Sequence, residues 1–236
     1  KQKTAYEIMP SLVGSEMCIR DRYYNLANSF RAYGEPRKAI RYYMLARKHE
    51  PNYLNRDYWW YEIAGCLFLV GHYVWSEKCY LKAWNLSRHF EPLIFALIAD
   101  SLFFQGRFKE AEKWFYKYLK SVNNPESEFY LKHLIVKFFI NNNLENPHRE
   151  TRLAISFITQ EAEFPREERE SLILLEKAIK SDPLCGLAWF NYGVYLNKIH
   201  QYEKSLFAFL TCCLIQDWDR EAWLNALFLA FNLKKY

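Results

Sequence analysis

The stretch "WFNYGVYLNKIHQYEKSLFAF", residues 189–209, contains two apolar patterns separated by a polar break. Before the break, Trp189, Gly193 and Leu196 fall on one face of a helix with about 3.6 residues per turn. After the break, Ser205 and Phe209 continue the same kind of spacing. The stretch therefore predicts two helices joined by a turn, with the small residues Gly193 and Ser205 where the helices approach each other.

The same spacing recurs along the chain. The large residue that opens each pattern is Tyr23, Trp60, Phe95, Trp189 or Trp223, and successive openings are 37, 35, 94 and 34 residues apart. Glycines fall between the two helices of a pattern, at Gly34, Gly71 and Gly106. A turn that ends a helix often needs a positive φ, which glycine adopts without steric cost.

This pattern resembles the tetratricopeptide repeat family, whose helix pairs of about 34 residues follow W-x2-L-G-x2-Y, then A-x3-F, then Pro. The resemblance covers residues 22–122 and 165–233. It implies an all-α fold, in which antiparallel helix pairs form a right-handed superhelical solenoid. From the spacing we expect about ten to twelve helices.

We expect one repeat domain over residues 23–233. Its units lie near 23–51, 57–89, 92–122 and 186–217, with a partial unit at 220–233 and an irregular segment at 126–183. Within the irregular segment, helices are predicted over 126–141, 149–161 and 165–181. Three helices are not a whole number of pairs, so one helix is either extra or split.

Both ends of the chain depart from the repeat. Residues 10–22, "PSLVGSEMCIRDR", resemble a translation of sequencing-adapter DNA that recurs in metagenomic protein sequences. We therefore expect residues 1–22 to be a non-native or disordered leader. The helix predicted over 220–233 carries large apolar residues around much of its circumference, whereas a terminal repeat normally has a polar outer face. This predicts a fragment of a longer chain that self-associates through residues 220–233.

Composition limits the function classes. The chain of 236 residues is 51% hydrophobic and 25% charged, which is typical of a folded protein. The net charge of +5 is spread out, so no nucleic acid partner is expected. No apolar run is long enough to span a bilayer, so no membrane association is expected either. Six cysteines without a C-x-x-C pair indicate reduced thiols and a cytoplasmic location.

No catalytic or metal-binding motif is found. Phosphate-binding glycine loops and H-E-x-x-H are absent from the sequence, and the six histidines are scattered. Cys212 and Cys213 are adjacent on a predicted helix, so their side chains diverge by about 100°. We expect no enzyme activity, no cofactor and no metal.

The resemblance places ligands on the concave face lined by the first helices. The residues at the inward positions are Tyr24, Asn28, Arg31, Tyr58, Tyr61, Phe68, Asp100, Phe103, Phe104, Phe190, Asn197 and Lys198. Family members that grip a terminal carboxylate use several Lys and Asn here, and this chain offers few basic residues. The groove is aromatic instead, which suits a segment anchored by apolar side chains. The same rings could equally pack against neighbouring helices.

Three functions fit this reading. The first is a non-enzymatic scaffold that binds another polypeptide in the concave groove. The second is the sensor or regulatory portion of a larger multidomain protein. The third is a chaperone that shields apolar segments, similar to those of type III secretion.

Overall fold

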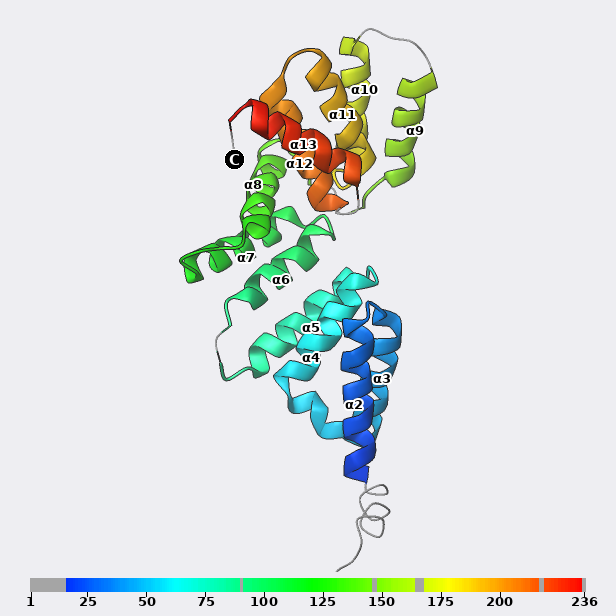
Figure 1. The fold of residues 1–236 in the computed structure, drawn as a ribbon, viewed down its shortest axis with the longest axis vertical. Coiled ribbons are helices and arrows are strands. Elements are labelled where there is room, and N and C mark those ends of the chain that lie inside the picture. Colours follow the sequence, from blue (N-terminus) through cyan, green and yellow to red (C-terminus); the bar gives the residue numbers. More distant parts are fainter. Residues whose placement is uncertain (1–15, 90, 146–147, 164–167, 217–218, 235–236) are drawn as a thin grey trace, which may run out of the picture. The chain divides into compact units, whose positions relative to one another are not determined.

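The structure is a computed structural model that describes residues 16–89, 91–145, 148–163, 168–216 and 219–234 (Figure 1). These residues form twelve α-helices, one short 3-10 helix and no β-strand. The predicted all-α fold is therefore confirmed. The first fifteen residues of the predicted leader lie outside the described part, whereas Glu16 begins a helix. No helix among the described residues is both long and apolar enough to cross a membrane.

The helices form two compact units, one reaching Leu102 and the other starting at Phe103. In the first unit, the chain order is α2 (Glu16–Ala32), α3 (Pro36–His49), the 3-10 helix η1 (Pro51–Asn55), α4 (Asp57–Leu69), α5 (Tyr73–Leu86) and α6 (Leu93–Phe103), whose last residue belongs to the second unit. Helices α2 and α3 form one pair, α4 and α5 form the next, and α3 packs against α4. Figure 1 shows these pairs running antiparallel.

The second unit contains seven further helices. They are α7 (Phe108–Ser121), α8 (Ser127–Asn141), α9 (Thr151–Glu163), α10 (Glu168–Ser181), α11 (Gly186–Lys198), α12 (Tyr202–Ile215) and α13 (Arg220–Asn232). Helices α9 and α10 pair, as do α11 and α12. The pairs are linked because α10 packs on α11 and α12 packs on α13.

Small residues set the distance within each pair. Ala64 is fully buried in α4, and its carbonyl accepts a hydrogen bond of 2.9 Å from Ser76 Oγ of α5. Gly193 of α11 occupies the equivalent place, and its carbonyl accepts a bond of 2.7 Å from Ser205 Oγ of α12. A larger side chain at either position would separate the two backbones. The prediction that Gly193 and Ser205 lie where the helices meet is confirmed.

In most pairs, the first helix ends in the same turn geometry. After α4, Gly71 has φ 83° and His72 N donates to Leu67 O at 2.9 Å. After α11, His200 has φ 61° and Gln201 N donates to Leu196 O, also at 2.9 Å. The residues with positive φ at such helix ends are Gly34, Gly71, Gly106, Asn143, His200 and Lys234. Sequence inspection found only the three that are glycine.

The irregular segment contains the three predicted helices, α8, α9 and α10. Helix α8 ends in the same turn as a first helix, because Asn143 has φ 53° and Leu144 N donates to Phe139 O at 2.9 Å. The chain then runs on to α9, which pairs with α10. Helix α8 is thus the extra helix, a first helix without a second one of its own.

Helix α8 is held by aromatic contacts with helices further along the chain. Phe139 stacks on Trp189 of α11, with ring centroids 5.6 Å apart, and Phe138 lies 4.7 Å from Phe207 of α12. Trp189 and Phe139 are both fully buried. These large rings fill the space where α8 meets α11 and α12.

The α9–α10 pair is closed by a buried carboxylate. Asp182 is inaccessible to solvent and accepts hydrogen bonds from Arg149 Nε at 3.0 Å and Thr151 Oγ1 at 2.7 Å. It also accepts a bond of 3.1 Å from the backbone N–H of Leu184. A buried charge is tolerated only with such partners. Asp182 therefore fixes the start of α9 next to the end of α10.

Replacing Gly193 by alanine should destabilise the second unit. An added Cβ would lie 3.1 Å from the ring of Phe209, which is buried and cannot withdraw. The clash should outweigh the helix propensity that alanine adds, and we expect a loss of about 1–2 kcal/mol in the free energy of unfolding. Urea titration followed by circular dichroism measures this.

Gly65→Ala is the matched control. Its Cβ would meet only the Tyr80 hydroxyl, at 3.4 Å, so the same gain in helix propensity should leave stability equal or up to about 1 kcal/mol higher. Equal effects of the two substitutions would contradict a close approach at Gly193.

Candidate functional site

A cluster of four tyrosines joins the first two pairs of the first unit. Tyr24 of α2 stacks on Tyr53 of η1, with centroids 5.5 Å apart and an interplanar angle of 12°. It also meets Tyr43 of α3 and Tyr58 of α4 edge to face, at 5.6 and 5.7 Å. Burial raises the pKa of Tyr24 to about 12, so its hydroxyl stays protonated. We call these four residues the tyrosine cluster.

Arg56 covers the outer side of the tyrosine cluster. Its guanidinium lies 5.8 Å from the ring centres of both Tyr53 and Tyr58, and its Nη1 donates a 2.9 Å hydrogen bond to the Tyr58 hydroxyl. Tyr58 is nevertheless 38% exposed. The cluster thus presents an open aromatic edge held in place by a cation.

The polar groove residues of α2 are engaged within the chain. Asn28 Oδ1 accepts a hydrogen bond of 2.6 Å from the Tyr43 hydroxyl. Arg31 Nε forms an ion pair of 2.8 Å with Glu62 of α4. Burial raises the pKa of the Glu62 carboxyl, and Arg31 opposes that shift. Since Arg31 already has a carboxylate partner, it does not offer a free positive charge for a ligand's carboxylate.

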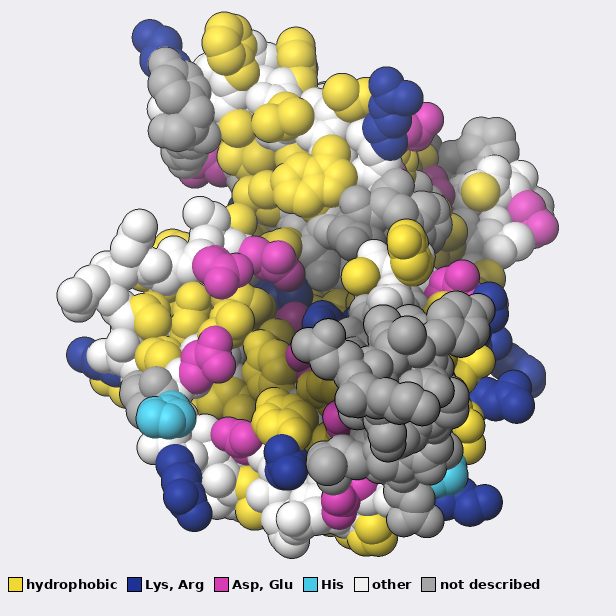
Figure 2. All heavy atoms as spheres, turned by 60° about the horizontal axis from the view of Figure 1, so that its bottom comes forward, with side chains coloured by type: hydrophobic (Ala, Val, Ile, Leu, Met, Phe, Trp, Pro, Cys, Tyr) yellow, Lys and Arg dark blue, Asp and Glu magenta, His cyan; other side chains and the backbone are white. Residues whose placement is uncertain are grey.

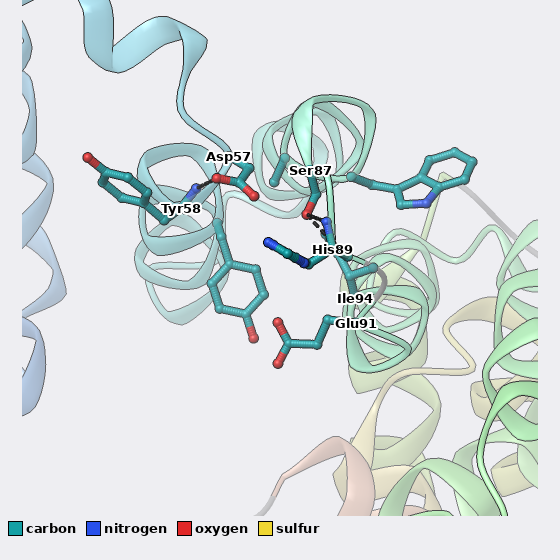
Figure 3. Close-up of a pocket in the computed structure, with 9 residues that line it drawn as sticks. Asp57, Tyr58, Ser87, His89, Glu91 and Ile94 are labelled. Atoms are coloured by element: carbon teal, nitrogen blue, oxygen red, sulfur yellow. Dashed lines mark hydrogen bonds between the residues drawn. The ribbon is translucent and has the colours of Figure 1, made fainter.

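A pocket opens on the α4 side of the first unit (Figure 3). It has a volume of about 140 Å³ and is lined by Asp57, Tyr58, Tyr61, Ala83, Trp84, Ser87, His89, Glu91 and Ile94. In Figure 3 the side chains of Asp57, His89 and Glu91 point into the hollow, whereas Tyr58 points away from it. Two of the predicted groove residues, Tyr58 and Tyr61, are therefore brought together at one pocket.

The remaining groove residues of the first unit lie differently. Phe68 is half-buried and meets Tyr73 edge to face at 5.3 Å across the α4–α5 turn. Asp100 of α6 is buried. The expectation that Asp100 faces an open groove is therefore corrected, because its helix is apolar and packed on nearly all sides.

In the second unit, the predicted groove residues do not form one surface. Phe103 is fully buried against Phe108 and Phe139, which corrects its assignment to the groove. Phe104 is half-buried beneath the Lys132 ammonium, 5.5 Å from its ring centre. Phe190 packs edge to face on Phe209 at 5.6 Å and supports the α12–α13 core.

Asn197 and Lys198 do line a hollow at the end of α11. Its volume is about 600 Å³, and it also includes Phe228 and Leu229 of α13. The Lys198 ammonium lies 4.4 Å from the ring centre of Tyr195, so it is partly held by its own helix. This hollow is larger than the pocket at Tyr61, but it contains fewer aromatic groups.

Several residues at the first unit's site escaped sequence inspection. Tyr53 and Arg56 lie in the connection between α3 and α4, and His89 and Glu91 lie in the connection between α5 and α6. The repeat pattern assigns ligand positions only to first helices, so connections carried no expectation. The aromatic and charged character of "NYLNRDY" was the one available signal.

The four buried cysteines, Cys66, Cys79, Cys212 and Cys213, are suited to packing and not to nucleophilic chemistry. Burial raises the pKa of Cys66 and Cys79 to about 11 and that of Cys212 and Cys213 to about 12. A thiol is nucleophilic only as the thiolate. Among the described residues there is also no group of His, Cys, Asp and Glu that could hold a metal ion.

The four buried cysteines should resist alkylation in the folded protein. At pH 8 a thiol with a pKa of about 11 is only about one part in a thousand thiolate, and burial also blocks access. After one hour with iodoacetamide, peptide mass spectrometry should find these four unmodified, whereas full modification is expected in guanidinium. Rapid labelling of Cys212 or Cys213 in the native protein would reveal an activated thiol and contradict this description.

Comparison with known proteins gave matches in structure only. No family model matches the chain, and no curated protein matches it in sequence. Solved structures with a similar fold include YrrB, a TPR protein described as having an unusual peptide-binding site, with 17% identity, a TM-score of 0.43 and 91% coverage of each chain. The TPR2AB domain of yeast Sti1, solved with pHSP90, has 16% identity and a TM-score of 0.43, covering 92% of this chain and 85% of that one.

A third similar structure is PilF of Pseudomonas aeruginosa, with 13% identity and a TM-score of 0.46, covering 93% of this chain and 86% of that one. Within this chain, helix pairs recur, small residues lie where their helices meet, and one turn geometry follows the first helices. The chain is thus an all-α array of helix pairs of the tetratricopeptide type.

Proposed function

We propose that this protein is a non-enzymatic scaffold that binds a segment of another polypeptide on the aromatic surface of its first unit. The observation that carries the proposal is the open edge of the tyrosine cluster next to the pocket at Tyr61. Tyrosine rings offer a large contact area and lose little conformational entropy on binding, which is why they dominate protein recognition surfaces. Here they are already fixed by stacking, so a ligand would not have to order them.

The surroundings of these rings support a peptide ligand more than a small molecule. The pocket of about 140 Å³ holds only one side chain, while the exposed ring of Tyr58 and the partly buried ring of Tyr24 continue beyond it. A linear segment can place one side chain in the pocket and lay its backbone across the rings. Since the five cysteines whose side chains the structure describes are free thiols, we also propose that the protein works in a reducing compartment, the cytoplasm.

Tyr58→Ala should weaken binding of such a segment. Peptides selected from a displayed random library against the wild-type protein should bind the variant about 5- to 30-fold more weakly, since a central ring contributes about 1–2 kcal/mol. Tyr33→Ala is the control, because Tyr33 is 82% exposed in the same unit but lies in the α2–α3 turn, away from the cluster.

Isothermal titration calorimetry gives the affinities, and thermal melting checks that both variants stay folded. The proposal fails if the selection yields no specific peptide, or if the selected peptides bind Tyr58→Ala as tightly as the wild type.

We also propose that two copies of the chain associate through α13. One face of this helix packs on α12 through Ala226 and Leu229, but the opposite face is apolar and exposed. Its residues are Trp223, Leu224, Leu227, Phe228 and Phe231. Leu227 takes the place that Ala64 and Gly193 hold in α4 and α11, where a second helix approaches closely. A leucine there favours face-to-face packing with an equivalent α13 instead.

Leu227→Asp should therefore make the protein monomeric. Leu227 is 62% exposed, so a charge there costs little within one chain but would be buried in the dimer. Sedimentation velocity at about 50 μM should show a dimer for the wild type and for Leu69→Asp, a similarly exposed leucine at the end of α4. A wild-type monomer at that concentration would remove the proposed self-association.

A further inference from the structure

We infer that the pocket at Tyr61 takes the positively charged side chain of a lysine or arginine from the bound polypeptide. This inference rests on the proposed function and adds the chemistry of the recognised residue. The volume of the pocket, about 140 Å³, matches a single long side chain, since an engineered cavity of roughly 150 Å³ accommodates one benzene molecule.

The charges of the pocket are of one sign. Asp57 and Glu91 both contribute carboxylates, and none of the lining residues is a lysine or arginine. Asp57 Oδ1 accepts a hydrogen bond of 2.8 Å from the backbone N–H of Tyr58, which leaves its second oxygen available. Within the described part of the chain, no lysine or arginine forms an ion pair with either carboxylate. An anionic ligand would be repelled here.

A purely apolar side chain fits these carboxylates poorly. It would remove water from Asp57 and Glu91 without giving a hydrogen bond in return, and that costs free energy. A cation supplies both the opposite charge and the donors. This differs from the expectation of an apolar anchor, which considered the rings of the first helices without the carboxylates between them.

An aromatic wall completes the site for a cation. Tyr61 lines the pocket, and ring faces attract ammonium and guanidinium groups. The chain uses this interaction elsewhere, since the Lys117 ammonium lies 4.1 Å from the Trp114 ring centre. Figure 2 shows one face of the molecule, on which carboxylates lie directly beside groups of hydrophobic side chains.

The loop after α5 positions His89, which lines another side of the pocket. Ser87 Oγ donates a 2.8 Å hydrogen bond to His89 O, and His89 N donates to Ser87 Oγ at 3.3 Å. These two bonds hold a tight loop from which the imidazole projects into the hollow near both carboxylates (Figure 3). A protonated imidazole would compete with a ligand cation, so the test uses pH 8, where histidine side chains are ordinarily neutral.

The test uses single residues as probes, so it does not depend on a known partner. Nα-acetyl-arginine amide and Nα-acetyl-lysine amide are titrated into the protein at pH 8, and the δ1-methyl signal of Ile94, which lines the pocket, is followed by NMR. We expect saturable shifts with a Kd in the millimolar range, as for other very small ligands. Nα-acetyl-citrulline amide has nearly the shape of the arginine probe without its charge, and should shift the signal at least tenfold less.

Neutralising the carboxylates should abolish the effect. Glu91→Gln should weaken binding of the arginine probe about fivefold. The double variant, Glu91→Gln with Asp57→Asn, should weaken it at least about tenfold. Glu163→Gln with Glu170→Gln removes the same charge from exposed positions of α9 and α10 and should change nothing. Because Glu91 is exposed in a loop, its single variant keeps the test valid if the double variant folds poorly.

Three results would overturn the inference: no shift from either cationic probe at tens of millimolar, equal shifts from the citrulline probe, or unchanged binding in Glu91→Gln and the double variant. The selected peptides separate the two proposals. If their binding depends on Tyr58 but is unchanged when their lysine and arginine residues are replaced by norleucine, the scaffold function stands and only the cation site is removed. Probes that bind while no peptide does would support the pocket and count against the scaffold.

Discussion

The close approach of two helices at one small residue is the constraint on which the rest of this structure depends. Ser76 and Ser205 each reach across to a carbonyl of the first helix, at Ala64 and Gly193, and this is possible only because those residues have little or no side chain. Once the backbones are this close, the large residues of the repeat must lie on the outer flanks of each pair. There they meet the next pair and make the core.

That arrangement also explains where the aromatic residues go. Trp59 and Trp189 are buried between pairs, whereas Tyr24, Tyr53 and Tyr58 collect where a connection joins two pairs. Tyr24 and Tyr58 are only partly covered there, whereas Tyr53 of η1 is buried. The candidate site is therefore a by-product of how consecutive pairs are linked, with the carboxylates of Asp57 at the start of α4 and Glu91 in the α5–α6 loop adding a preference for a cation.

Much of the fold could be predicted from the sequence because small and large residues recur at fixed positions of the repeat. Small residues at Gly193 and Ser205 and glycines at the turns are visible without a structure, and so are the three helices of the irregular segment. The site was less predictable. Tyr58 and Tyr61 line one pocket, and their place in a groove stays a prediction, whereas Asp100 and Phe103 are buried, because burial depends on which helices pack next to them. His89 and Glu91 lie in a loop whose path no periodic pattern describes.

The turns after the first helices differ in the steric cost of their left-handed backbone conformation. In the first unit, both are made by glycine, at Gly34 and Gly71, for which a left-handed backbone carries no steric penalty. In the second unit, Gly106 makes one such turn, but Asn143, His200 and Lys234 adopt the same backbone with a Cβ atom, which costs about 1 kcal/mol for each residue. The second unit therefore stores conformational strain at these three turns, and glycine at any of them would stabilise it without a change in the unit that holds the tyrosine cluster.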